Sequence, residues 1–528
     1  MNKDSKDQFL IPVMNRKKRM FLYYLIAIWF MSLLTFLFWW CRPEHILSWN
    51  KFIINSLLFF WINGLPGYFF FFVSRMRVVN PATRIPDNWQ VAMITTRAPA
   101  ETFSVVKNTL LAMKNQEFPH DTWLADEDPD KEIREWCRQN DIFLCSRKGI
   151  PEYHRATWPR RRKSKEGNLA YFYDHYGYDR YDFVVQMDAD HIPAENYLIE
   201  MLRPFVNDNI GYVSAPSICD SNAGSSWTAR GRLYSEAIMH GPLQAGYSNG
   251  FASLCIGSHY AVRTKALKEI GGLGPELAED HSTTLMMNGN GWRGVHAFNA
   301  LASGEGPPAI AACITQEFQW SRSLMIILLT ELPKYWKKLP SRLKIQFLFS
   351  ELWYPLFGLM FLIGTFLPII AVLTGEPWVS VSFIDFILYS VPLTFSIIAV
   401  VWFLKKNLWV RPYYAPVMSW EIVLFQILRW PWAVYGSIMG IISVIKNHIP
   451  EFIVTPKGEL KNRSLSWNIL YPYYVLIIVS AIPGILIKEN NNAAGYHFFL
   501  IINVLTYVIL IFSILILNYN ESKRQVRH

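Results

Sequence analysis

The sequence has few charged residues. Only 17% of its 528 residues are Asp, Glu, Lys or Arg, whereas 52% are hydrophobic, and the mean hydropathy is +0.14. Soluble globular proteins carry about 25% charged residues, and disordered chains are poor in hydrophobic residues. The composition therefore argues against an ordinary soluble enzyme and against a disordered chain, and it favours a membrane protein.

Cysteine is also scarce, with six residues and no C-x-x-C spacing among them. Five of the six lie in one long polar region, which residues 85–330 make up. Neither a zinc site nor a disulfide framework is supported by this pattern. The six are Cys41, Cys137, Cys145, Cys219, Cys255 and Cys313.

Charge is almost absent from several runs long enough to span a bilayer, which takes about 20 apolar residues. We predict six spans, two before the polar region and four after it, at 21–40, 52–73, 352–374, 386–404, 469–487 and 498–517. The stretch 422–445 is apolar too, but Arg429 interrupts it and proline and glycine flank or enter it. A helix lying in the membrane interface fits this stretch better than a seventh span.

Basic residues predict the orientation of the spans. Lys and Arg are concentrated before residue 20, after residue 520 and just after 404, whereas the loops 375–382 and 489–497 have almost none. By the positive-inside rule both ends and the polar region are cytoplasmic. The net charge of +10 thus lies largely beside anionic lipid, and we expect no nucleic-acid partner. The first span lacks a cleavage site and is expected to be a retained anchor.

The polar region alternates between short apolar runs and helical periods. Strands are expected at 90–95, 123–125 and 142–145, and helices at 103–114 and 130–140. This alternation predicts an α/β domain with a sheet of parallel strands. Ligands bind such sheets at the carboxyl ends of the strands.

Two carboxylates and an imidazole follow the next expected strand, 183–187, in the sequence D-A-D-H. The carboxylates of Asp188 and Asp190, with the adjacent imidazole of His191, can hold a divalent cation against a diphosphate, because hard oxygen ligands suit Mg²⁺ or Mn²⁺. A pair of carboxylates at a strand end is also common as a loop cap, so this motif alone leaves both interpretations open.

Three later segments each allow a structural and a chemical interpretation. Glu279 and Asp280 open an expected helix over 277–289, where acidic residues cap helices but where a general base could also lie. Trp320, in Q-E-F-Q-W, is either an interface anchor before the basic, amphipathic 332–344 or one wall of a sugar site. Lys457, in F-I-V-T-P-K-G, is either a juxtamembrane charge or part of a loop that closes over a phosphate.

In this order and with this membrane layout, the motifs resemble those of processive family 2 glycosyltransferases of the cellulose synthase type, and more distantly those of hyaluronan and chitin synthases. The resemblance covers residues 52–517. It pairs A-E-D at 278–280 with T-E-D, Q-E-F-Q-W at 316–320 with Q-x-x-R-W, and the segment at 452–458 with F-x-V-T-x-K. It implies a GT-A domain with a Rossmann-like mixed sheet, inserted in a helical transmembrane domain of about six spans with amphipathic interface helices.

The resemblance also implies a role for each matched residue. Asp188, Asp190 and His191 would hold the metal, Mg²⁺ or Mn²⁺; Asp280, with Glu279, would be the catalytic base. The UDP-sugar donor would be bound by Thr95, Asp126, Lys165, Asp188, Gln316, Gln319, Arg322 and Lys457. Trp320, Cys255 and Gly257 would contact the acceptor, and Phe452, Val454, Thr455 and Lys457 would form a gating loop.

Some residues depart from the family pattern. Gln319 stands where the family has Arg, and Arg322 could supply the missing cation. The segment 217–222 does not match the usual Phe-Phe-Asn near the acceptor. The linkage or the product therefore need not be those of cellulose.

The function that the resemblance implies is a processive, inverting β-glucan synthase in the bacterial inner membrane. It would transfer glucose from UDP-glucose to the non-reducing end of a growing glucan and translocate the glucan across the bilayer. Accessory export or regulatory proteins are possible partners. The alternatives are a non-processive enzyme that makes a glycolipid, a synthase of another β-glycan that contains N-acetylglucosamine, and an inactive assembly or export subunit.

The expected layout of the chain has eight segments. It has a basic cytoplasmic N-terminus at 1–20, two transmembrane helices at 21–75, the cytoplasmic catalytic domain at 85–330, an amphipathic interface helix at 331–350, two transmembrane helices at 351–406, an interface helix with the gating loop at 415–463, two transmembrane helices at 467–518, and a basic cytoplasmic tail at 519–528.

Overall fold

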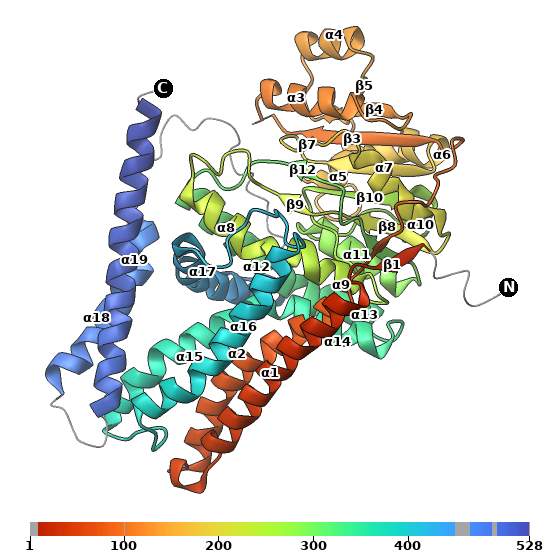
Figure 1. Cartoon of the computed structure of the whole chain (residues 1–528). Helices are drawn as coiled ribbons and strands as arrows, with labels where there is room; N and C mark the ends of the chain where they lie inside the picture. Colours follow the sequence, from red (N-terminus) through yellow and green to blue (C-terminus); the bar gives the residue numbers. More distant parts are fainter. Residues whose placement is uncertain (1–8, 100, 449–464, 488–493, 527–528) are drawn as a thin grey trace.

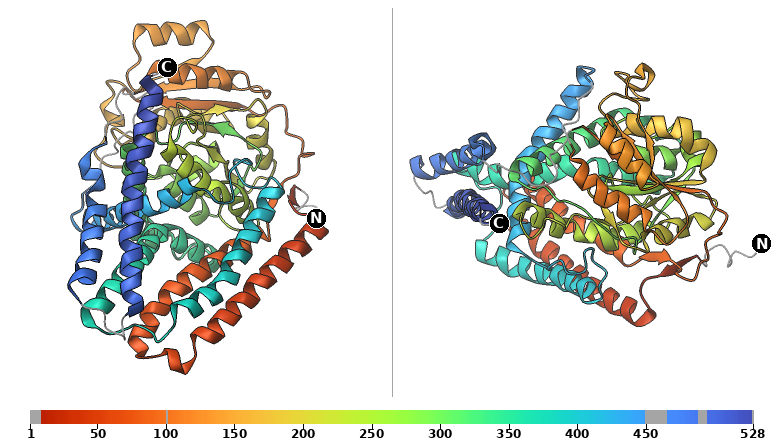
Figure 2. Two further views of the ribbon diagram at one scale, coloured as in Figure 1. Left: turned by 60° about the vertical axis from the view of Figure 1, so that its left-hand side comes forward. Right: turned by 90° about the horizontal axis from the view of Figure 1, so that it is seen from above.

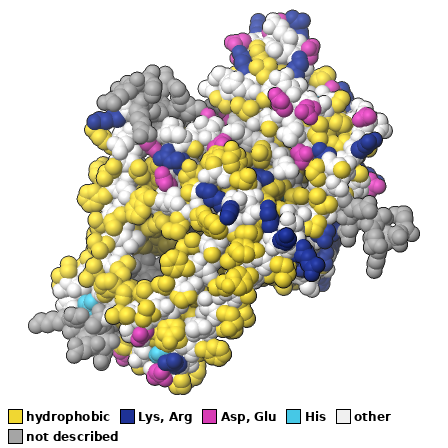
Figure 3. All heavy atoms as spheres, viewed as in Figure 1, with side chains coloured by type: hydrophobic (Ala, Val, Ile, Leu, Met, Phe, Trp, Pro, Cys, Tyr) yellow, Lys and Arg dark blue, Asp and Glu magenta, His cyan; other side chains and the backbone are white. Residues whose placement is uncertain are grey.

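The computed structural model describes residues 9–99, 101–448, 465–487 and 494–526. An α/β domain stands beside a set of long helices that extend away from it (Figure 1). Hydrophobic side chains cover the long helices on the face shown, whereas acidic and basic side chains are gathered mostly on the α/β domain (Figure 3). This distribution fits a domain in water attached to helices in lipid.

The centre of the α/β domain is a seven-stranded mixed sheet with the order β11-β8-β10-β6-β3-β4-β5. Its strands are β3 (Val91–Arg97), β4 (Asp121–Asp126), β5 (Phe143–Cys145), β6 (Phe183–Met187), β8 (Ile210–Ser214), β10 (His259–Arg263) and β11 (Arg293–His296). Only β10 runs antiparallel to its two neighbours, and the other pairs are parallel. The mixed sheet is confirmed; the alternation of strands and helices alone predicted parallel strands throughout.

Helices cover both faces of the sheet, because its central strands are apolar on both sides. On one face, α3 (Phe103–Lys114) and α7 (Tyr197–Leu202) bury Val106, Leu110 and Met201. On the other, α5 (Lys165–Phe172) and α11 (Glu279–Gly289) bury Phe172 and Met287. The sheet therefore lies between two apolar layers, and its carboxyl-terminal edge is where polar side chains collect.

Seven of the described helices are long and apolar enough to cross a membrane, by length and composition. They are α1 (Arg16–Trp40), α2 (Trp49–Val73), α15 (Trp353–Thr374), α16 (Phe383–Lys406), α17 (Trp420–Ile445), α18 (Trp467–Leu486) and α19 (Ala494–Val526). Aromatic rings join them, as where Trp39 of α1 stacks on Tyr389 of α16 with 4.4 Å between ring centroids. The chain is a multi-pass membrane protein.

The helix α17 differs from the other six. Figures 1 and 2 show it running crosswise to α18 and α19. It packs along α12 (Ile310–Ile326) and α8 (Trp227–Ile238) of the α/β domain, and it has the largest buried share among the seven candidates, 44%. Six spans with α17 in the membrane interface remain our prediction.

The region expected to form one interface helix over 331–350 is divided in the structure. It consists of α13 (Leu332–Tyr335), a turn, and α14 (Ser341–Glu351). Pro340 lies directly before α14. Proline has no backbone N–H and disfavours the helical conformation of the residue before it, so a continuous helix through this point was the wrong prediction.

Close contact between α17 and α12 requires a glycine. A Cβ at Gly436 would lie 2.5 Å from the carbonyl oxygen of Phe318 and would overlap the hydroxyl of Ser321. Alanine in a helix gains about 0.5–1 kcal/mol over glycine, but overpacking of this kind costs about 1–3 kcal/mol. We therefore expect Gly436→Ala to lower the thermal midpoint of the detergent-solubilised protein.

The matched control is Gly364→Ala in α15, where an added Cβ meets nothing within 4 Å. This variant should unfold at the parent temperature or above it. Equal midpoints for the two variants would contradict the close packing of α17 on α12.

Candidate functional site

The side chain of Lys165 joins three segments at the carboxyl end of β6. Its ammonium donates to Oδ1 of Asp188 at 2.7 Å and to the carbonyl oxygen of Gly257 at 2.6 Å. Burial acts to lower the pKa of Lys165, but the carboxylates of Asp188, Glu279 and Asp280 outweigh it and raise the pKa. The ammonium thus stays charged beside the D-A-D-H motif.

Steric crowding requires glycine at the third position of K-E-G-N, which is Gly167. Lys165 is the first residue of α5, and the N-cap Ser164 accepts from the backbone N–H of Gly167. A Cβ at Gly167 would overlap the carbonyl oxygen of Arg161 and Nη1 of Arg147. Only glycine lets the first turn of α5 approach this loop, and that approach fixes the origin of the Lys165 side chain.

Asp188, Asp190 and His191 each offer a ligand atom within 4.8 Å of the others. Nδ1 of His191 lies 3.3 Å from Oδ1 of Asp190, and Oδ2 of Asp190 accepts from the N–H of Glu305 at 3.1 Å. Burial acts to lower the pKa of His191, but Asp190 outweighs it and raises that pKa to about 10. The two carboxylates fit a hard divalent cation, and the imidazole can join them when the bound cation displaces its proton.

Asp280 and Glu279 open α11 on the other side of Gly257. A Cβ at Gly257 would lie 3.3 Å from Oδ2 of Asp280, so Asp280 and Lys165 contact the same glycine. Burial raises the pKa of Asp280 and raises that of Glu279 to about 8. A partly exposed carboxylate with a raised pKa can take up a proton.

Asp126 ends β4 and is fully buried. Its two oxygens accept from Nη1 of Arg97 at 3.1 and 3.0 Å, and Oδ1 accepts from the N–H of Asp128. Burial is the main cause that raises its pKa, and the N–H of Asp128 and the charge of Arg97 act against it. Thr95, on β3, is also fully buried. Contact of either side chain with a nucleoside remains a prediction.

The Q-E-F-Q-W motif lies on α12, with Arg232 of α8 beside it. Nη1 of Arg232 donates to Oε1 of Gln316 at 2.9 Å, and its guanidinium lies over the ring of Trp320, 4.2 Å from the centroid. Gln319 is 2% exposed. No motif in the sequence singled out Arg232, since its two partners lie far along the chain.

Two other predicted residues have aromatic or apolar neighbours in the structure. The guanidinium of Arg322 lies over the ring of Phe318 at 5.2 Å, and the charges that act on it are those of Glu276 and Arg161. Cys255 is 1% exposed and packs in the core under the sheet. Its burial speaks against contact between the Cys255 side chain and an acceptor.

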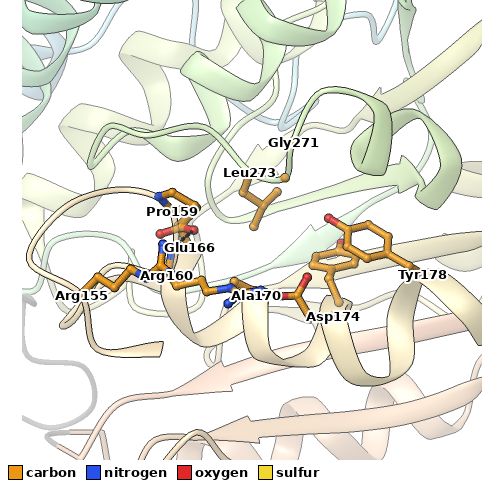
Figure 4. Close-up of a pocket in the computed structure, with 11 residues that line it drawn as sticks. Arg155, Pro159, Arg160, Glu166, Ala170, Asp174, Tyr178, Gly271 and Leu273 are labelled. Carbon is orange, nitrogen blue, oxygen red and sulfur yellow. Dashed lines mark hydrogen bonds and ion pairs between the residues drawn. The ribbon is translucent and has the colours of Figure 1, made fainter. Parts of the chain in front are cut away.

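The predicted gating residues Phe452, Val454, Thr455 and Lys457 lie outside the described residues. Among the described residues, the cavity shown in Figure 4, of about 270 Å³, is lined by none of the predicted site residues. Its polar groups bond to one another: Glu166 accepts from the N–H of Arg160 at 2.9 Å, and Asp174 pairs with Arg160. The candidate site is therefore the cluster around Lys165, and not this cavity.

Comparisons with known proteins identify the class. Residues 152–323 match the family described as "Glycosyltransferase like family 2". This range holds Lys165, the D-A-D-H motif, Asp280 and Trp320. The mixed sheet, the carboxylates at the end of β6 and this match show a glycosyltransferase domain of the GT-A fold that is similar to family 2 over residues 152–323.

Comparison with individual curated proteins shows which glycosyltransferases the chain is similar to. The chain is 23% identical over 458 residues to the "Cellulose synthase 1 catalytic subunit [UDP-forming]" of Komagataeibacter xylinus, with 82% of this chain and 57% of the relative covered. It is 24% identical over 412 residues to the corresponding subunit of Pseudomonas fluorescens, with 75% and 51% covered. The chain spans about half the length of these relatives. Over most of its length the chain is thus similar to cellulose synthase catalytic subunits.

Among solved structures, the chain is similar to the mannosyltransferase PcManGT from Pyrobaculum calidifontis in complex with GDP-Man and Mn²⁺. The two are 13% identical, with a TM-score of 0.40 and coverage of 87% of this chain and 97% of that one.

Glu317, inside the Q-E-F-Q-W motif, has a structural partner. It is 1% exposed and lies 3.5 Å from Nη1 of Arg429 on α17. Removing one member of a buried ion pair costs about 3–5 kcal/mol, because the other charge is left unpaired. We expect Glu317→Ala to lower the thermal midpoint strongly and Glu317→Leu combined with Arg429→Met to restore most of it. A double variant as unstable as the single one would contradict this assignment.

Proposed function

We propose that the protein is a processive, inverting β-glucan synthase that uses UDP-glucose. The observation that supports this most directly is the contact of Lys165 with both Asp188 and Gly257, which brings a cation, the metal-ligand motif and Asp280 to one place. The two cellulose synthase relatives are UDP-forming by name, which favours a UDP-sugar as donor.

Each side chain has a distinct part in the proposed reaction. Lys165 is placed to bind the diphosphate of the donor and to stabilise the charge that develops on the leaving group. Asp188, Asp190 and His191 would hold Mg²⁺ or Mn²⁺, which neutralises diphosphate charge when bound. Asp126, Gln316 and Gln319 are further candidates for the donor, and Phe452, Val454, Thr455 and Lys457 for the loop over it.

The proton and the glycosyl group move in opposite directions. Asp280 takes the proton from a hydroxyl at the non-reducing end of the glucan while that oxygen bonds to the anomeric carbon. The bond from that carbon to the diphosphate breaks on the opposite face, so an α-linked donor gives a β-linked product and UDP leaves. Trp320 is the proposed stacking platform for the terminal sugar.

The membrane helices suggest where the product goes. We place the α/β domain in the cytoplasm, with six spans in the bacterial inner membrane and α17 at its cytoplasmic face. The growing chain would then pass outward between the spans, and accessory export or regulatory proteins could receive it.

The direct test is to incubate the detergent-held protein with Mn²⁺ and labelled UDP-glucose, and to digest the product with linkage-specific glucanases. We expect insoluble polymer. Asp280→Asn should lower its rate by about 100-fold to 10,000-fold, since the variant lacks the general base. The control is Asp208→Asn, an exposed carboxylate in the loop before β8, which should match the parent protein.

The outcome of the same assay separates the alternatives. Label only in extracted lipid would indicate a glycolipid enzyme, polymer only from UDP-N-acetylglucosamine would indicate another β-glycan, and no turnover of any donor would contradict an enzymatic role.

Metal binding can be measured without turnover. We expect Mn²⁺ titrated into the protein with UDP, and followed by electron paramagnetic resonance, to bind at least about tenfold more weakly to Asp190→Asn, because a ligand is lost. Asp208→Asn again serves as the control. Unchanged Mn²⁺ affinity in Asp190→Asn would contradict a metal site at the D-A-D-H motif.

A further inference from the structure

Four polar side chains form a connected row between α8 and α12. His240, Glu236 and Arg232 follow one another at one-turn intervals along α8 and its continuation, and Gln316 faces them from α12. Nε2 of His240 lies 3.3 Å from Oε2 of Glu236. Nε of Arg232 lies 3.2 Å from Oε1 of Glu236, and its Nη1 reaches Gln316.

The row holds a fixed charge beside the acceptor tryptophan. Burial acts to raise the pKa of Glu236, but Arg232 and His240 outweigh it and lower that pKa to about 2, so Glu236 stays ionised at neutral pH. The side chain of Arg232 is 13% exposed. Its guanidinium is thus held on one side by a carboxylate and on the other by Gln316, and its planar face lies on the ring of Trp320.

Arg232 also lies close to the metal-ligand motif. Its charge acts on the thiol of Cys219, and Sγ of Cys219 lies 4.0 Å from Nε2 of His191. Arg232 is therefore close enough to act electrostatically on a thiol beside the D-A-D-H motif. Arg232 is also the basic side chain that contacts two residues of the motif Q-E-F-Q-W. The fourth residue of that motif, Gln319, carries no charge.

We propose that Arg232 is the positioning residue of the acceptor platform in this protein. Its guanidinium covers part of the Trp320 ring and fixes the orientation of the indole. An acceptor sugar can then stack only on the part of the ring that Arg232 does not cover. The inference rests on the proposed function, because it assumes that Trp320 binds the acceptor.

The decisive variant is Arg232→Lys, which keeps the charge but lacks the planar fork that stacks and bonds at once. Two rates are measured with the same donor: transfer to polymer, and release of UDP by hydrolysis, which needs no sugar acceptor. We expect the ratio of transfer to hydrolysis to fall about tenfold, the size of a lost cation–π contact with its hydrogen bond. The KM for the donor in hydrolysis should change less than that ratio, since the stacking contact with Trp320 is lost whereas a single hydrogen bond joins Arg232 to a donor candidate, Gln316.

The matched control is Arg230→Lys on the same helix. Arg230 pairs with Glu421 of α17 at 3.3 Å and donates to the carbonyl oxygen of Ala223, and no contact joins it to Trp320 among the described residues. It should leave the ratio unchanged. Glu236→Gln is a second variant that frees Arg232 without removing it, and the ratio should fall in this variant also.

Three results would overturn the inference: a parental ratio in Arg232→Lys, a ratio that falls equally in Arg230→Lys, or a rise in the donor KM that accompanies equal loss of both rates. Failure of the proposed function would look different, since the parent protein would then form no glucan from UDP-glucose. The same ratio is then measured with whichever UDP-sugar the parent transfers, and the same three results apply.

Discussion

The ammonium of Lys165 is the contact on which the site depends. It is bonded at once to a side chain at the end of β6 and to a backbone carbonyl of the loop that precedes β10. Gly257, which provides that carbonyl, also lies against Asp280. This partly buried cation near three carboxylates offsets charges that would otherwise repel one another at the end of the sheet.

A second set of contacts ties this site to the membrane. Gln316 and Trp320 of the Q-E-F-Q-W motif on α12 contact Arg232, whereas Glu317 and Phe318 of the same motif face α17. Gly436 permits that packing, and the pair of Glu317 with Arg429 crosses it. The guanidinium of Arg429 also lies 4.6 Å from the ring centroid of Phe357 on α15. These contacts join α12, the helix that carries Trp320, to α17 and α15.

The sequence predicted the parts of the fold that depend on local pattern. The period of 103–114 and the apolar run of 183–187 gave a helix and a strand with the observed bounds, because side chains of these segments face one layer or lie between two. The break before α14 was missed although Pro340 marks it. The antiparallel β10 was missed because strand direction depends on the path of the chain between strands.

The site, like the fold, has parts that local sequence predicts and parts that depend on contacts between distant residues. The D-A-D-H motif is contiguous, so its three side chains were brought together by the prediction and by the structure alike. Arg232 could not be found, because its contacts with Gln316 and Trp320 span more than 80 residues. The buried position of Cys255 depends on the path of the turn before β10. Neither the composition of this segment nor its hydrophobic period predicts that path.

The central claim is that one chain both forms a glucan and moves it across a bilayer. Its most direct test is synthesis by the purified protein in sealed proteoliposomes, with UDP-glucose and Mn²⁺ supplied outside and glucanase added after synthesis. If α/β domains that face outward deliver product to the interior, the polymer will resist the enzyme until detergent opens the vesicles. Polymer fully digested before detergent is added would contradict translocation by this chain.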